Sequence, residues 1–129
     1  MALILKALEG SAVDFSLTRN TVSSIPKIRG HTPYLRKPAQ VDQIKSDMLA
    51  GRYRFESPEG MIAGVEDAQG VIHLTEGQHR MNAALEIFQE TGDAAFVNRL
   101  LESARQGYGG RTYLPKGTAP VESMPLPRR

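Results

Sequence analysis

The sequence predicts a small α+β domain built from amphipathic helices and a β-hairpin. Apolar residues recur at helical spacing in three windows, residues 38–50, 78–90 and 94–106. Two strand-like stretches, 61–66 and 71–75, are joined by a short Asp-Ala-Gln-Gly connection that is typical of a hairpin. The chain has 129 residues, which is the usual length of one domain.

The composition excludes several classes of protein. Hydrophobic residues make up 40% of the chain and charged residues 23%, which is typical of a soluble globular domain. We expect no membrane segment, because no stretch reaches the apolar length of a span, and no signal peptide, because "MALILKALEG" is interrupted too soon. The chain contains no cysteine, which excludes disulfides, thiolate catalysis and zinc-thiolate sites.

The first elements expected along the chain are a weakly structured segment, a strand and a helix. Residues 1–24 have no clear periodicity, and "SSIPKI" at 23–28 reads as a short strand. Pro38 suits the first position of the next helix, and Gly51 suits its end. The expected apolar face of this helix consists of Val41, Ile44, Met48 and Leu49.

Two further helices are expected after the hairpin. The helix that starts at Gln78 ends at Gly92, and Asp93 is suited to cap the last helix. The expected buried residues of the first are Met81, Ala84, Leu85 and Phe88. Those of the second are Phe96, Val97, Leu100, Leu101 and Ala104. The folded domain is therefore expected to span residues 25–114.

Some stretches are expected to be structural or irregular. "GYGGR" at 107–111 lacks the Gly-Lys-Ser/Thr ending of a phosphate loop and reads as a loop after the helix. Residues 115–129 form a proline-rich tail that we expect to be disordered or extended. Strand alternation places His73 opposite Ile72 and Leu74, where an exposed histidine is expected. The tyrosines suit either base stacking or packing at the core rim: Tyr34, Tyr53, Tyr108 and Tyr113.

Net charge is only +2, but the basic residues are unevenly distributed. The run "PKIRGHTPYLRK" contains basic side chains and no acid. Local basic patches attract polyanions, although a solvated basic loop explains the run equally well. The residues that would contact the backbone of a nucleic acid are Arg29, His31, Arg36 and Lys37.

The junction "TEGQHR" joins the second hairpin strand to a helix and has the features of an anion site. Gly77 permits close approach of the backbone to a ligand, and the first N–H groups of the helix are free to bind phosphate. We expect the phosphate ligands to be Gly77, Gln78 and Arg80. Glu76, His79 and Arg80 are the candidate catalytic residues, with Glu76 or His79 moving the proton. A dipole-complementing Glu76 paired with Arg80 on the surface is the structural alternative.

"TEGQHRMNAAL" resembles the signature of the ParB/sulfiredoxin superfamily, in which a strand leads through an acidic residue and glycine to an arginine and a helix. The context agrees over residues 22–92, since "TPYLRKP", a helix and a hairpin precede "EGQHR" in the family order. The resemblance implies a small mixed sheet with packed helices and a phosphate site at a strand-turn-helix junction.

The sequence departs from the family pattern at some positions, and these differences exclude some of the activities found in the family. Gln78 stands where sulfiredoxins have their catalytic cysteine, which excludes that activity. The second nucleotide motif and the helix-turn-helix of chromosome-partitioning ParB proteins are not visible. The chain is most similar to the stand-alone ParB-like nuclease domains, a group that includes the C-terminal toxin domains of bacterial polymorphic toxins. Such a toxin acts in the cytoplasm after delivery within a larger secreted protein, and it has an immunity protein as partner.

The resemblance predicts cleavage of nucleic-acid phosphodiesters, in DNA or RNA. An ATPase or small-molecule kinase would use the same phosphate site, and a binding module would retain it without turnover. A toxin that acts by capturing a host protein would leave the phosphate site empty. No metal site is predicted, because one carboxylate makes a poor dedicated magnesium site, so a divalent ion would need phosphate oxygens and water as further ligands.

Overall fold

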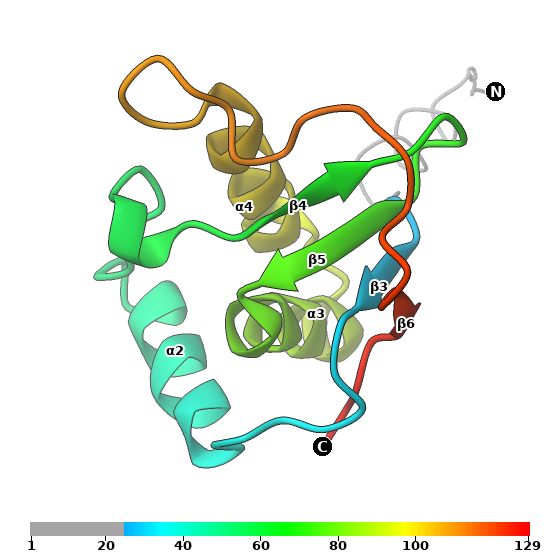
Figure 1. Ribbon diagram of the computed structural model, residues 1–129. Coiled ribbons are helices and arrows are strands. Elements are labelled where there is room, and N and C mark those ends of the chain that lie inside the picture. The colour runs from blue at the N-terminus through cyan, green and yellow to red at the C-terminus, as the bar shows by residue number, and fades with distance from the viewer. Residues whose placement is uncertain (1–24) are drawn as a thin grey trace, which may run out of the picture.

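The computed structural model describes residues 25–129 and confirms the general α+β class (Figure 1). Within these residues, a mixed sheet of four strands has the order β4-β5-β3-β6. The strands are β3 at Ile28–Gly30, β4 at Ala63–Glu66, β5 at Ile72–Glu76 and β6 at Met124–Pro125. The first 24 residues, expected to be weakly structured, lie outside the described part of the chain.

The hairpin between β4 and β5 forms as the sequence predicts. The two strands are antiparallel, with Val65 opposite His73 and Glu66 opposite Ile72. Asp67 fixes the turn, because its Oδ1 accepts hydrogen bonds from the backbone N–H groups of Gln69 at 2.9 Å and Val71 at 3.0 Å. Strand β5 then pairs in parallel with β3, which brings the segment after β3 beside the segment after β5.

Three α-helices lie in the described part of the chain, within a residue or two of their expected positions. They are α2 at Ala39–Leu49, α3 at Gln78–Thr91 and α4 at Ala95–Gln106, and a short 3-10 turn, η1, spans Pro58–Gly60. Helix α3 packs against both α2 and α4, and its buried residues meet those of β5 in one core (Figure 1). The central side chains of this core include Met48, Ile62, Ile72, Leu74, Met81, Ile87, Val97, Leu100 and Leu101.

One expected core residue of α2 lies on the surface. The side chains of Val41 and Met48 are buried, but Leu49 is 62% exposed. Positions 41, 44 and 48 follow each other at intervals of three and four, whereas residue 49 is turned about 100° from residue 48 around the helix. The assignment of Leu49 to the apolar face was therefore wrong.

The proline-rich segment 115–129 is extended and lies along both edges of the sheet (Figure 1). At one edge, the N–H of Glu66 donates to Pro115 O and the N–H of Gly117 donates to Glu66 O. At the other edge, β6 pairs antiparallel with β3. The last residue, Arg129, forms ion pairs with Asp42 of α2 and Glu86 of α3.

This C-terminal segment explains why the expectation for His73 was wrong. His73 lies on the sheet face opposite Ile72 and Leu74, as alternation predicts, but its residue is only 4% exposed. Its Nδ1 lies 2.6 Å from the Ser123 hydroxyl, and its Nε2 lies 2.8 Å from Asp67 Oδ2. A segment fifty residues further along the chain therefore covers this face.

Candidate functional site

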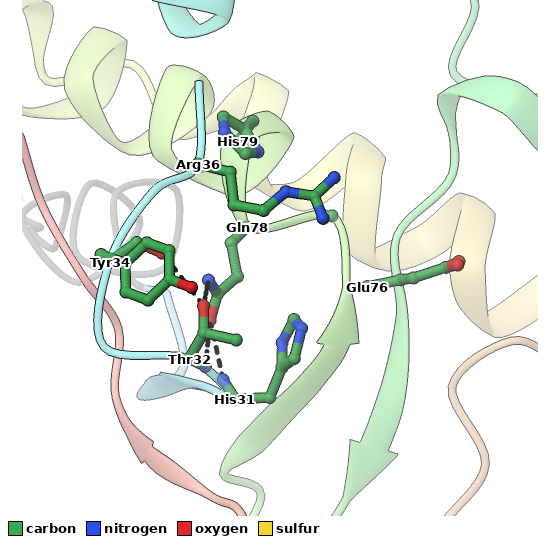
Figure 2. Close-up of a pocket in the computed structure, with 8 residues that line it drawn as sticks. His31, Thr32, Tyr34, Arg36, Glu76, Gln78 and His79 are labelled. Carbon is green, nitrogen blue, oxygen red and sulfur yellow. Dashed lines mark hydrogen bonds between the residues drawn. The ribbon is translucent and has the colours of Figure 1, made fainter. Parts of the chain in front are cut away.

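A cavity of about 280 Å³ lies at the N-terminus of α3, where the β3–α2 loop faces the β5–α3 turn (Figure 2). It brings the predicted strand-turn-helix junction together with part of the basic run. Its lining residues are His31, Thr32, Tyr34, Arg36, Glu76, Gly77, Gln78 and His79. Thr32 was not among the site residues predicted from the sequence, and Tyr34 was considered only for base stacking or packing.

Gly77 forms the floor of the cavity with a backbone that only glycine adopts easily. Its φ is +94°, and a Cβ at this position would lie 2.7 Å from Ile62 Cγ2. No side chain caps the helix here, and its first turn contains no acidic residue. The first helical hydrogen bond runs from Met81 N–H to Gly77 O, so the preceding N–H groups point out of the helix end. This end can therefore accept an anion.

Gln78 anchors the loop that forms the opposite wall. Its Oε1 accepts hydrogen bonds from the N–H groups of His31 at 2.7 Å and Thr32 at 3.3 Å, and its Nε2 donates to Thr32 Oγ1 at 2.7 Å. The residue is only 5% exposed. Its side chain is thus occupied by the protein, and only its backbone N–H is available to a phosphate.

His79 holds the same loop further along. Its Nε2 lies 3.1 Å from the backbone nitrogen of Lys37 and accepts that N–H, which requires an unprotonated Nε2. Burial lowers the pKa of His79, and the nearby charges of Arg36, Arg80 and Lys37 lower it further. His79 is therefore neutral near pH 7, and its Nε2 lone pair positions the loop.

We expect acid to weaken this contact. The pKa of His79 in the folded chain lies below its ordinary value of 6.5, so the unfolded chain takes up the proton first. The stabilisation is complete above pH 6.5 and is lost as the pH falls through the folded-state pKa. Between about pH 7.5 and about pH 5, Tm should therefore fall more for the wild type than for His79→Gln, which keeps an acceptor but gains no proton.

The comparison isolates His79, because the other groups that titrate are present in both proteins. The pKa values of Asp42, Asp67 and Glu86 are all lowered, so these carboxyls titrate below the tested range. Equal falls in Tm for both proteins would contradict the assigned role of His79.

His31 has an unused polar atom beside the cavity. Its Nδ1 is buried and has no hydrogen-bond partner among residues 25–129. Figure 2 shows its ring standing beside the Gln78 side chain. Buried polar atoms usually have a partner, so an unpaired ring nitrogen at a cavity is suited to a ligand.

Arg36 and Tyr34 form the outer part of the cavity. The guanidinium of Arg36 forms no ion pair within the described part of the chain, and the residue is exposed. Tyr34 is 60% exposed and its ring lies at the same mouth (Figure 2). A permanent cation and an aromatic ring at one opening suit a phosphate that carries a base.

Glu76 stands at the rim, at the end of β5. It is exposed and forms no hydrogen bond with any side chain in residues 25–129. Figure 2 shows its carboxylate directed away from the Gln78 and His31 side chains. Glu76 also lines a second cavity, so this residue borders both.

Arg80 and Arg29 do not line this cavity. The Arg80 guanidinium donates to Glu59 O at 2.7 Å and Met61 O at 3.2 Å, which ties α3 to the η1 turn. The Arg29 guanidinium donates to Ser123 Oγ at 3.0 Å, because Arg29 pairs with His73 in the sheet and shares its covered face. Lys37 contributes its backbone N–H, and its side chain is not part of the lining.

The chain matches no family model, and comparisons with curated proteins and with solved structures found no match. In residues 25–129, no three His, Asp or Glu side chains gather into a group that could hold a metal ion. None of the helices in this part of the chain is long and apolar enough to cross a membrane.

Proposed function

We propose that this chain is a nuclease that hydrolyses nucleic-acid phosphodiesters at the N-terminus of α3. The observation that supports this most is the composition of the 280 Å³ cavity, which combines an uncapped helix N-terminus with Arg36, Tyr34 and the unpaired Nδ1 of His31. The resemblance of "TEGQHRMNAAL" to ParB-like nuclease domains supports the same reaction. We also propose that the chain belongs to this family. If the domain is a toxin, an immunity protein is its partner.

The phosphate would bind at the end of α3. The N–H groups of Gln78 and His79 point toward the anion, and the helix dipole is positive at this end. Arg36 adds a planar charged group suited to phosphate oxygens. These donors are fixed before the substrate arrives, so they stabilise the charge that develops on the phosphoryl oxygens in the transition state.

Hydrolysis would use Glu76 and His31. Glu76 takes a proton from water as the water oxygen attacks phosphorus, and a P–O bond forms. The opposite P–O ester bond breaks, and His31 gives a proton to the leaving oxygen. Gln78 and His79 hold the loop that carries His31 and Arg36, so they are positioning residues in this scheme.

Turnover assays on DNA, RNA and ATP test the proposal directly. We expect DNA or RNA to be cleaved, with products that carry a terminal phosphate, and no ATP hydrolysis in the absence of nucleic acid. ATP turnover alone would favour a nucleotide-dependent enzyme. Saturable binding of oligonucleotide with no turnover of any substrate would favour a binding module.

Binding should depend on salt through Arg36. Each phosphate contact contributes roughly one unit to the slope of log affinity against log salt, so Arg36→Gln should lower the slope by about 0.7–0.9. The matched control is Arg128→Gln, which removes the same charge from an exposed residue beside a different cavity. The measurement is oligonucleotide affinity over a salt series. Equal slopes for the wild type and Arg36→Gln would place Arg36 away from the bound backbone.

A further inference from the structure

A second cavity, of about 520 Å³, lies on the far side of Glu76 from the phosphate cavity. Both cavities include Glu76 in their walls. The second is formed by the ends of β4 and β5, the η1 turn and the segment that follows α4. The residues that give it chemical character are Thr75, Glu76, Arg111 and Tyr113.

The wall that carries Arg111 and Tyr113 is held firmly against the sheet. The backbone groups of Tyr108 and Arg111 bond to each other in both directions, at 3.1 and 3.3 Å, which closes a tight turn. The N–H of Tyr113 donates to Ala104 O of α4 at 2.8 Å, and its carbonyl accepts the N–H of Gly64 of β4 at 2.9 Å. The "GYGGR" stretch therefore has a defined position beside the site.

Gly107 makes that position possible. Its φ is +73°, and a Cβ there would lie 1.8 Å from Arg111 O. The chain can thus turn back sharply after α4 and bring Arg111 to the edge of the second cavity.

The second cavity also pairs an arginine with a tyrosine, although Tyr113 is half-buried against the core whereas Tyr34 is exposed. Arg111 is exposed and forms no ion pair within residues 25–129. Its guanidinium carbon lies 6.0 Å from the centre of the Tyr113 ring. Proteins that bind single strands combine cations along the backbone with aromatic rings on which bases stack. Arg36 with Tyr34 and Arg111 with Tyr113 are two such pairs, one on each side of Glu76.

We infer that the second cavity is a subsite for a neighbouring nucleotide of the same strand, and that the enzyme cuts within a chain. This inference rests on the proposed nuclease function. A strand would enter past Arg36 and Tyr34, cross Glu76 and leave past Arg111 and Tyr113. The scissile phosphate lies beside Glu76, with nucleotides bound on both sides. No end of the strand is needed, so the cleavage is endonucleolytic.

The test compares a circular single strand with a linear strand of the same sequence, for both DNA and RNA, and a small diester, bis-p-nitrophenyl phosphate. The wild-type chain should cut the circle. Arg111→Gln should lower kcat/KM for both strands by on the order of tenfold, the size of one lost stacking or backbone contact, and leave the small diester unchanged. Arg128→Gln serves again as the control for loss of charge.

The outcomes separate the two proposals. Cleavage of the linear strand with an intact circle would overturn cleavage within a chain and leave the nuclease function standing. An Arg111→Gln variant that cuts both strands at the wild-type rate would overturn the second subsite. If neither strand nor the small diester is cut, the nuclease function fails and the subsite fails with it.

Discussion

Glu76→Gln is expected to lose hydrolysis by on the order of a hundredfold to ten-thousandfold, while the chain still folds and still binds oligonucleotide. The amide keeps the size and an acceptor oxygen of the carboxylate, but it cannot take the proton from water. Glu76 is exposed and forms no ion pair in residues 25–129, so the fold does not depend on its charge. Affinity should hold or rise, because a negative charge beside the phosphate has been removed.

Single-turnover rates, oligonucleotide affinity and thermal melting of the same protein samples are the measurements. Glu102→Gln is the matched control, because it removes the same charge from an exposed residue of α4 that lines neither cavity. A Glu76→Gln variant with normal melting and most of its turnover would end the general-base assignment. A parallel loss of affinity and turnover would make Glu76 a residue that shapes the site.

The helices and the hairpin could be predicted from the sequence because their signals are local. The spacing of Val41 and Met48 sets the buried face of α2, and Asp67 fixes the turn between neighbouring strands. The burial of His73 had no local signal. It depends on Ser123, fifty residues away, and strand alternation shows only which face a side chain occupies.

The difference between local signals and distant contacts also decides which parts of the site could be predicted. The positive φ of Gly77 and the helix end beyond it follow from a strand-turn-helix pattern, so the place of the cavity was predictable. The partners of its arginines were not. Arg80 bonds to carbonyls of the η1 turn, nineteen and twenty-one residues earlier in the chain, and Arg29 bonds to Ser123. A sequence pattern shows that an arginine is suited to bind phosphate. It does not show whether acceptors elsewhere in the fold take the hydrogen bonds of that arginine instead.

The sequence did not predict that Gln78 anchors the β3–α2 loop. Substitution of Gln78 is expected to have the largest effect after that of Glu76. Gln78→Ala removes all three hydrogen bonds to His31 and Thr32 and leaves their N–H groups without an acceptor. We expect a stability loss of about 1–3 kcal/mol, seen as a Tm lower by several degrees. Oligonucleotide affinity should fall as well, because the loop that carries Arg36 loses its anchor. Gln89→Ala is the control, since Gln89 is an exposed glutamine of the same helix.

Gln78→Glu separates the anchor from the phosphate site. The new carboxylate keeps the acceptor for the N–H groups of His31 and Thr32. The Thr32 hydroxyl, which donates to Tyr34 O at 3.0 Å, can exchange that bond for one to the second carboxylate oxygen. A negative charge at a helix N-terminus is also favourable, so Tm should hold near the wild-type value. The same charge repels a bound phosphate, and oligonucleotide affinity should fall on the order of tenfold or more. If Gln78→Glu melts normally and binds oligonucleotide as tightly as the wild type, no phosphate lies at this helix end, whatever Gln78→Ala does to stability.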